Sequence, residues 1–161
     1  MDFKNLIYSI CCLSFAIVIG AAVYEHLAVV PQWTAAPPRS LAMFQGTYGL
    51  QAQNFWKPIH PVTLLLFVAT LYTSWKSARK VNVLIAFVGY FLVLAITAIY
   101  FVPELLAITT SAYSDHIDLG LAERAADWER FSLIRLSCLV ILSIILFFGL
   151  TKPKEHQTLG I

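Results

Sequence analysis

Most residues that could carry chemistry stand at the ends of long apolar stretches in this 161-residue chain. The first stretch ends on Glu25 and His26, the second follows His60, and the third is followed by Glu104. The fourth contains Arg135, about a turn and a half from its start. If the stretches form antiparallel helices, all four bring an ionisable group to the same end of the molecule.

These residue types are suited to proton transfer. An imidazole exchanges a proton near neutral pH, so His26 or His60 is a candidate general base. Arg135 could stabilise the negative charge that remains after a proton is removed. A lone charge inside a membrane helix costs roughly 2.5–3.5 kcal/mol, so we expect a carboxylate partner, Glu25 or Glu104. The simpler interpretation is that side chains at helix ends reach headgroups or solvent.

The same groups could also bind a metal ion. His26, His60, Glu25 and Glu104 supply the nitrogen and oxygen donors that zinc, copper or iron accept. No HExxH or paired ExxH spacing accompanies them, so both a transition-metal site and a site without a cofactor stay open. His116 lies in a polar segment and is interpreted as a surface residue.

The elements that position these groups must be membrane helices. Hydrophobic residues make up 59% of the chain and charged residues 12%, against about 25% charged in soluble domains. A water-soluble fold of this size has no interior large enough for so much apolar surface. The lipid bilayer is therefore expected to be part of its solvent. A net charge of +2 without a basic tract gives no reason to expect a nucleic-acid partner.

Four apolar segments predict an all-α fold, a four-transmembrane-helix bundle forming a single membrane domain. Their approximate bounds are 6–26, 55–75, 81–102 and 130–150. About 20 helical residues are needed to cross the roughly 30 Å hydrocarbon core. The second apolar run covers only 61–75, so its helix must begin earlier, near Asn54 or Phe55.

The basic residues orient these helices. Lys4, the 76–80 turn and the tail residues Lys152 and Lys154 alternate along the chain with two long segments that hold most acidic residues. Basic residues favour the cytoplasmic side, which predicts an N-in/C-in, multi-pass protein of the cell membrane with both termini cytoplasmic. The four tryptophans fit the aromatic belts of the two interfaces: Trp33, Trp56 and Trp128 at one, Trp75 at the other.

Short motifs mark the ends of three of these segments. They are Gly20-x-x-x-Tyr24-Glu25 followed by Pro31-x-Trp33, then Thr97-x-x-Tyr100-Phe101-x-Pro103, and Trp128-x-Arg130-x-x-x-x-Arg135. Together they resemble the anthrone oxygenase-like family of small four-helix membrane proteins, most of which are uncharacterised. The resemblance implies a four-helix bundle and, for a few members, oxygenation of a polycyclic anthrone to a quinone without an obvious cofactor. The positions that carry over are Tyr24, Pro103, Trp128, Arg130 and Arg135.

The residues and the resemblance together predict a polar His/Glu/Arg pocket at the non-cytoplasmic end of the bundle. The expected ligand is a small lipophilic molecule, aromatic or quinone-like, and the expected chemistry is that of an oxidoreductase or oxygenase. Proton abstraction would precede reaction with oxygen or a quinone. The residues expected to form the walls of the substrate pocket are Tyr24, Phe55, Trp56, Trp128 and Arg130.

Two other classes fit the same sequence. The protein could be a non-enzymatic small subunit of a larger membrane complex, since short loops leave little mass outside the bilayer. It could also be a metal-binding membrane protein. Copurification separates the first from an enzyme, because a subunit leaves mild detergent with stoichiometric partners and an enzyme leaves alone or as a homo-oligomer.

Overall fold

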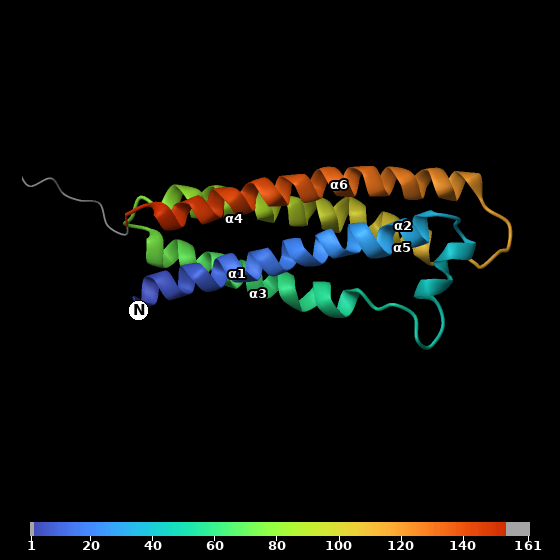
Figure 1. Cartoon of the computed structure of the whole chain (residues 1–161), viewed down its shortest axis with the longest axis horizontal. Helices are drawn as coiled ribbons and strands as arrows, with labels where there is room; N and C mark the ends of the chain where they lie inside the picture. Colours follow the sequence, from blue (N-terminus) through green and yellow to red (C-terminus); the bar gives the residue numbers. More distant parts are fainter. Residues whose placement is uncertain (1, 154–161) are drawn as a thin grey trace, which may run out of the picture.

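The computed structural model describes residues 2–153, and all regular elements in that range are helical (Figure 1). Lys154, counted above among the basic tail residues, lies outside the described residues. Four helical segments are long and apolar enough to cross a membrane: Phe3–Thr34, Gln53–Ser74, Lys80–Thr109 and Leu119–Thr151. Their length and composition fit an integral, multi-pass membrane protein in a lipid bilayer.

The first and third segments are interrupted and the second and fourth are not. The first consists of α1 (Phe3–Tyr24), the π-helical turn η1 (Glu25–Val29) and α2 (Val30–Thr34). The third consists of α4 (Lys80–Ile96), the π-helical turn η3 (Thr97–Phe101) and α5 (Val102–Thr109). The uninterrupted helices are α3 (Gln53–Ser74) and α6 (Leu119–Phe148), and two short 3-10 helices are η2 (Arg39–Phe44) and η4 (Gly149–Thr151).

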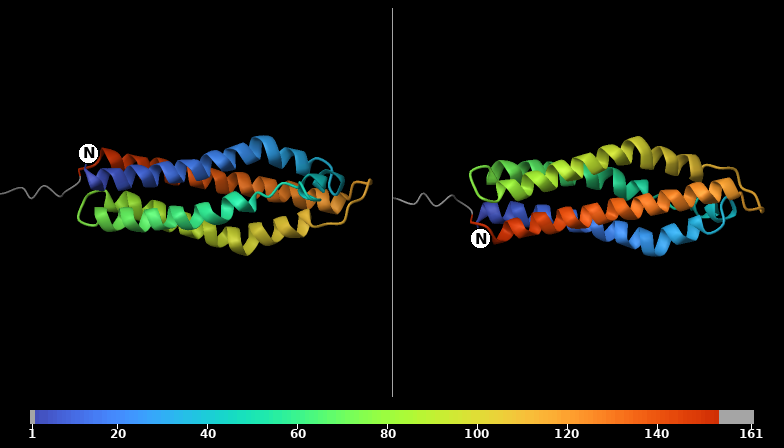
Figure 2. Two further views of the ribbon diagram at one scale, coloured as in Figure 1. Left: turned by 90° about the horizontal axis from the view of Figure 1, so that it is seen from below. Right: turned by 90° about the horizontal axis from the view of Figure 1, so that it is seen from above.

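Each π-helical turn precedes a proline. Pro31 and Pro103 cannot donate a backbone hydrogen bond, and their rings crowd the preceding turn of helix. The helix is wider at these points. The amide of Val30 donates to the carbonyl of Glu25, and the amide of Val102 donates to the carbonyl of Thr97, five residues back in each case. Both segments bow outward at these points (Figure 2).

Three helical segments extend further than the sequence predicted, all at the end away from the termini. The first continues to Thr34 rather than 26, the third to Thr109 rather than 102, and the fourth begins at Leu119 rather than 130. The last starts there because the Asp118 side chain caps the helix and accepts from the Leu121 amide at 3.0 Å. A 32-residue segment is about 48 Å long, so it outreaches the hydrocarbon core.

The predicted basic segments meet at the other end of the bundle. Arg79, in the turn between α3 and α4, is buried and bonds residues near both ends of the described range. Its Nη1 donates to Asn5 Oδ1 at 2.8 Å and its Nε to the Lys152 carbonyl at 3.0 Å. The two ends of the described chain and the α3–α4 turn therefore share one face of the molecule, as the charge pattern predicted.

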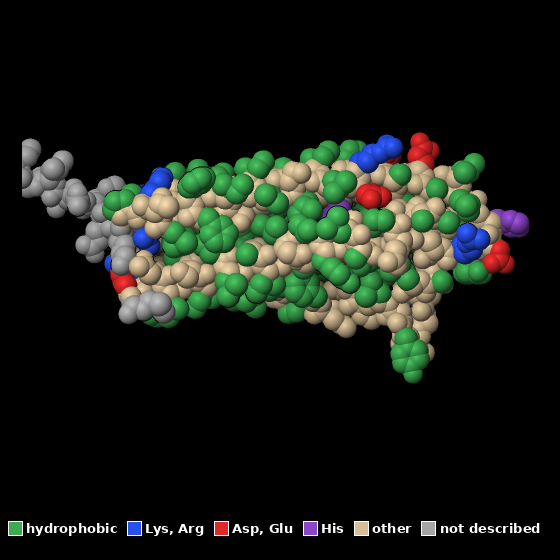
Figure 3. All heavy atoms as spheres, viewed as in Figure 1, with side chains coloured by type: hydrophobic (Ala, Val, Ile, Leu, Met, Phe, Trp, Pro, Cys, Tyr) green, Lys and Arg blue, Asp and Glu red, His purple; other side chains and the backbone are tan. Residues whose placement is uncertain are grey.

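The buried side chains form two separate clusters. The bundle core lies among the long helices near the termini and consists of Tyr8, Cys11, Cys12, Phe15, Val18, Phe67, Val83, Ala86, Tyr90, Leu139 and Leu146. The head core lies at the opposite end and consists of Val30, Trp33, Leu41, Phe101, Ile108, Leu121, Ala125 and Trp128. Hydrophobic side chains also cover the outside along the bundle (Figure 3), as expected of helices surrounded by lipid.

Two tryptophans contradict the prediction of an interfacial belt. Trp33 and Trp128 are only 2% and 5% exposed, because the longer helices bring them together in the head core at a ring distance of 5.4 Å. Trp75 is 55% exposed, with Lys80 Nζ 5.1 Å from its ring centroid, and keeps the position expected of an interfacial residue.

Candidate functional site

A cavity of about 440 Å³ lies between the four helical segments, at the level where the bundle core meets the head core. Its walls are mostly aliphatic and aromatic. Six of the residues singled out in the sequence line it: Glu25, His26, Trp56, His60, Trp128 and Arg135. The first, second and fourth segments thus bring their expected ionisable groups to one space, whereas Glu104 of the third segment does not line it. The space is large enough for a small organic molecule.

The Arg135 guanidinium is held by hydroxyls and aromatic rings. Its Nη2 donates to Ser132 Oγ at 2.8 Å and its Nη1 to Thr97 Oγ1 at 3.2 Å. Its Cζ lies 4.2 Å from the Phe101 ring centroid and 5.9 Å from that of Trp128. Such cation–π contacts, strongest where water is excluded, offset part of the cost of the half-buried charge.

The predicted ion pair between Arg135 and a carboxylate does not form. Within residues 2–153, Arg135 makes no direct salt bridge, although Glu25 lines the same cavity. Glu104 is directed elsewhere: its Oε1 accepts from Arg124 Nε at 2.7 Å, on the surface between α5 and α6. The positive charge of Arg135 is thus not neutralised by direct contact and is available to an anionic ligand.

His26 is fixed at both ring nitrogens. Its Nδ1 lies 2.8 Å from the Ala22 carbonyl oxygen, which can only accept, so Nδ1 carries a proton. In the neutral ring Nε2 then accepts from the Ser132 hydroxyl at 3.0 Å, and Ser132 in turn accepts from Arg135. This chain of bonds orients the guanidinium, and it favours a positioning role for His26 over that of a general base.

His60 belongs to a second group on the facing wall. Its ring stacks on Trp56 at 5.3 Å with an interplanar angle of 19°, and its Nδ1 is 2.7 Å from the Tyr90 hydroxyl. Trp56 Nε1 donates to Glu25 Oε1 at 2.7 Å. Among residues 2–153, none bonds His60 Nε2, which leaves that nitrogen able to meet a ligand in the cavity.

Three of the predicted wall residues lie outside the cavity lining. Tyr24 is 66% exposed on the outer surface of α1, because one residue along a helix turns the side chain by about 100° from Glu25. Phe55 packs edge-on against Trp56, with ring centroids 4.9 Å apart. Arg130 is exposed and pairs with Asp127 at 3.2 Å, which agrees with the simpler interpretation of a surface charge.

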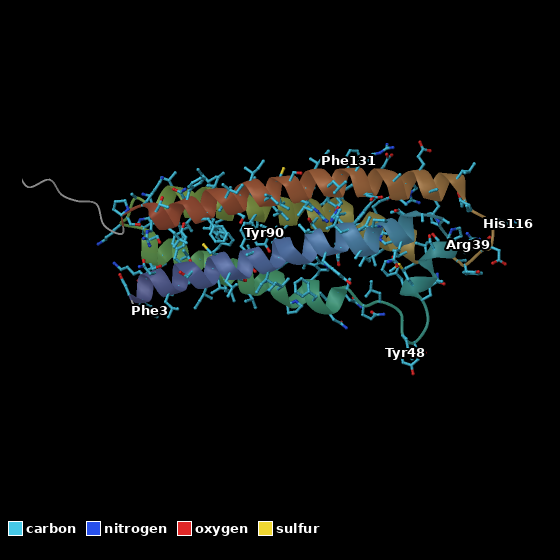
Figure 4. All side chains as sticks on the ribbon, viewed as in Figure 1. Phe3, Arg39, Tyr48, Tyr90, His116 and Phe131 are labelled. Carbon is cyan, nitrogen blue, oxygen red and sulfur yellow. The ribbon has the colours of Figure 1, made fainter. Side chains whose placement is uncertain are left out.

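The predicted metal ligands are not brought together. Across the described range no three His, Cys, Asp or Glu side chains come close enough to share a metal ion. His26 is committed to a carbonyl and a serine, and Glu104 faces an arginine. His116 lies at the far end of the molecule, as Figure 4 shows, in agreement with its interpretation as a surface residue.

Sequence reasoning missed Tyr90, Ser132 and Thr97 as parts of the site. Ser132 lies between Trp128 and Arg135 in the sequence and is the group that links His26 to Arg135. Tyr90 lies in the middle of the bundle (Figure 4) and is fully buried. Its hydroxyl needs a partner inside an apolar helix pair, and that requirement is the signal that could have revealed it.

Comparison with models of known protein families, with curated proteins and with solved structures finds no match for this chain.

Proposed function

We propose that the protein binds a small, flat lipophilic molecule, aromatic or quinone-like, in this cavity and promotes its oxidation by dioxygen. One observation carries the proposal: an apolar cavity of about 440 Å³ presents a guanidinium without a direct counter-charge opposite an imidazole with an open nitrogen. The volume falls within the roughly 300–1,000 Å³ of small-molecule sites. Apolar walls accept the rings, and the polar groups accept an acidic hydroxyl or carbonyl.

The proposed reaction begins with proton removal. His60 Nε2 takes a proton from an acidic C–H group conjugated with the ring carbonyl, which in an anthrone is the methylene on the opposite side of the central ring, while Tyr90 holds the His60 Nδ1 in place. Arg135 stabilises the enolate oxygen that results. The enolate carbon then reacts with dioxygen: one oxygen atom becomes the new carbonyl and the other leaves as water. This is the anthrone-to-quinone chemistry that the resemblance described above implies, and it consumes no other reductant.

Matched substitutions test this assignment. We expect His60→Ala and Arg135→Gln to lower the rate of oxygen-dependent oxidation of 1,8-dihydroxyanthrone, followed by quinone absorbance, by about 10² or more. The controls are His116→Ala and Arg130→Gln, which remove the same side-chain types from exposed positions outside the cavity. Both controls should stay within about two-fold of wild type.

Other outcomes would contradict the assignment. Unchanged turnover in His60→Ala removes the general-base role, provided that the variant keeps the wild-type melting temperature. Arg135→Lys, which retains the charge, should recover part of the activity lost in Arg135→Gln if the role is electrostatic. A wild-type protein that neither binds nor oxidises the anthrone, and that copurifies with stoichiometric partners, would instead be a subunit of a larger complex.

The proposal includes an orientation. The end that carries Lys4, Lys76 and Arg79 is assigned to the cytoplasm by the distribution of basic residues, so that both termini are cytoplasmic and the cavity lies toward the non-cytoplasmic face. A protein in this orientation would meet its ligand in the outer half of the cell membrane.

Cysteine labelling tests the orientation. Tyr48, at the tip of the loop between η2 and α3, is fully exposed (Figure 4), and Lys76 is exposed at the opposite end. In a Cys138→Ser background, an impermeant maleimide should label Tyr48→Cys on intact cells and Lys76→Cys only after permeabilisation. Cys11 and Cys12 are buried and should stay unlabelled. The reverse pattern would invert the orientation.

A further inference from the structure

The cavity has its mouth on the side of the bundle. Among the residues that line it, four are exposed: Gln53, Lys57, Val102 and Leu106. The first two lie in the first turns of α3 and the other two in α5. α3 packs on α1 and α4, whereas α5 packs on α6 and follows the π-helical turn at which its segment bows outward (Figure 2). The seam between α3 and α5 is thus where the cavity reaches the surface.

The outer end of the cavity is covered by the head core. Phe101 and Trp128 line the cavity, with ring centroids 5.9 Å apart, and the Trp128 indole donates to the Phe101 carbonyl at 3.0 Å. Trp33, 2% exposed, packs against Trp128, and Leu41 is fully buried in the same cluster. A layer of closely packed aromatic rings therefore separates the cavity from the end of the molecule that extends beyond the hydrocarbon core.

The two lips of the mouth differ in polarity. Lys57 and Gln53 form the α3 lip, and Lys57 Nζ donates to Gln53 Oε1 at 2.9 Å. Val102 and Leu106, 45% and 56% exposed, form the α5 lip. α3 has 22 residues, about 33 Å, which matches the hydrocarbon thickness and places its first turns at headgroup depth. A mouth at this depth, apolar on one side and cationic on the other, suits an amphipathic molecule already dissolved in the bilayer.

We infer that the ligand enters this cavity sideways from the bilayer, through a portal between α3 and α5. Its class follows from the route: a membrane-partitioned phenol or enolisable ketone with one polar edge, which passes Lys57 and comes to rest on Arg135 while its hydrocarbon edge follows Val102 and Leu106. The inference rests on the proposed function for the identity of the site, and it adds the route and the requirement for partitioning into lipid.

Stopped-flow binding in lipid nanodiscs tests the portal. The probe is 1,8-dihydroxyanthraquinone, whose visible absorption shifts when its phenol ionises beside a cation. Val102→Trp and Leu106→Trp narrow the mouth, and we expect each to slow association and dissociation by at least about ten-fold while the Kd stays within about two-fold of wild type. Ile99→Trp is the control, because Ile99 is 79% exposed on the same helical segment and lies outside the cavity lining.

Each other result has a distinct meaning. If the probe binds and all three variants keep wild-type rates, the portal is overturned and the proposed function stands. If the mouth variants weaken binding without slowing it, these residues are walls of the site rather than a gate, which also overturns the portal. If wild-type protein does not bind the probe at all, the proposed function and the portal fall together.

Discussion

The bundle core and the head core of this protein are built on different principles. Around the bundle core the helices expose large apolar side chains, such as Leu13, Leu65 and Ile141, at 58–70% of their surface. Inside it, hydroxyls bond across helices, as where Ser14 Oγ lies 2.7 Å from Thr63 Oγ1. The head core buries two tryptophans in contact with each other, and charged pairs such as Arg124–Glu104 lie on the surface around it.

The difference shows how each solvent shapes a core. In lipid there is little hydrophobic gain when helices associate, so close packing and interhelical hydrogen bonds hold them together. In water the burial of tryptophan is itself a large driving force. The cavity lies where these two regimes meet, which explains how it combines apolar walls with a buried network of polar side chains.

The largest effect on stability is expected from a substitution in the head core. Trp33→Ala should lower the free energy of unfolding by about 3–5 kcal/mol, because it empties a fully packed aromatic site. Leu13→Ala, on the exposed surface of α1, should change it little in comparison. Thermal unfolding in mild detergent, read by circular dichroism, checks both. Equal loss in the two variants would mean that the head core is not a separate water-type core.

A smaller loss of stability is expected when a glycine at the basic end of the bundle is replaced by alanine. A Cβ atom on Gly149 would overlap the Tyr8 hydroxyl, which donates to the Leu146 carbonyl at 2.7 Å. Gly149→Ala should therefore cost about 1–3 kcal/mol through overpacking. Gly20→Ala is the control, since nothing lies within 4 Å of its added Cβ. A neutral Gly149→Ala in the same melting assay would mean that the helices can separate at that end without loss.

The hydrogen bond between the Ser14 and Thr63 hydroxyls should contribute still less to the free energy of unfolding. Thr63 donates to the Ile59 carbonyl at 2.8 Å, so Ser14 is the donor of the bond between them. A double-mutant cycle with Ser14→Ala and Thr63→Val should give a coupling of about 0.6 kcal/mol, the average measured for such bonds in membranes. A coupling far above about 1.7 kcal/mol would show that hydrogen bonding rather than packing dominates the bundle core.

The smallest effect is expected at the surface of the head region. The Arg124–Glu104 pair is partly solvated, so Arg124→Gln should cost about 0.2–1 kcal/mol. The cost should shrink further in high salt, because exposed charges are screened. Melting curves at low and high ionic strength provide the comparison. A loss that is large and independent of salt would place this pair in a dry environment, contrary to the water-type surface assigned to it.

Residue spacing predicted a good part of the candidate site. Glu25, His60 and Arg135 were expected at one end of the bundle, and all three line the cavity. The expected ion pair of Arg135 with Glu25 or Glu104 was wrong: Arg135 makes no direct salt bridge within residues 2–153, and α5 turns Glu104 toward α6. Trp33 was misplaced because a tryptophan at the end of an apolar run has the same local pattern whether it meets headgroups or a partner helix.

Helix boundaries, too, could be predicted only in part from the local sequence. The length needed to cross the hydrocarbon core predicted the first residue of α3 to within two positions, because the length of α3 matches that thickness. The first and third segments were predicted too short because they were ended at the Glu25-His26 pair and just before Pro103, and the fourth because it was begun after the charged residues 123–129. Apolar residues in these extensions, such as Leu121 and Ile108, can be recognised as core residues only when the packing of the head core is known.

The sequence by itself determined four helices long and apolar enough for a bilayer, the gathering of the basic segments at one end, and the two prolines that bend the first and third segments. Tertiary structure decided which ionisable groups meet. Tyr24, Glu25 and His26 are consecutive, yet one faces outward, one lines the cavity beside Trp56, and one bonds Ser132. Successive side chains on a helix point about 100° apart, and only packing against the other helices fixes the rotation that assigns each its neighbour.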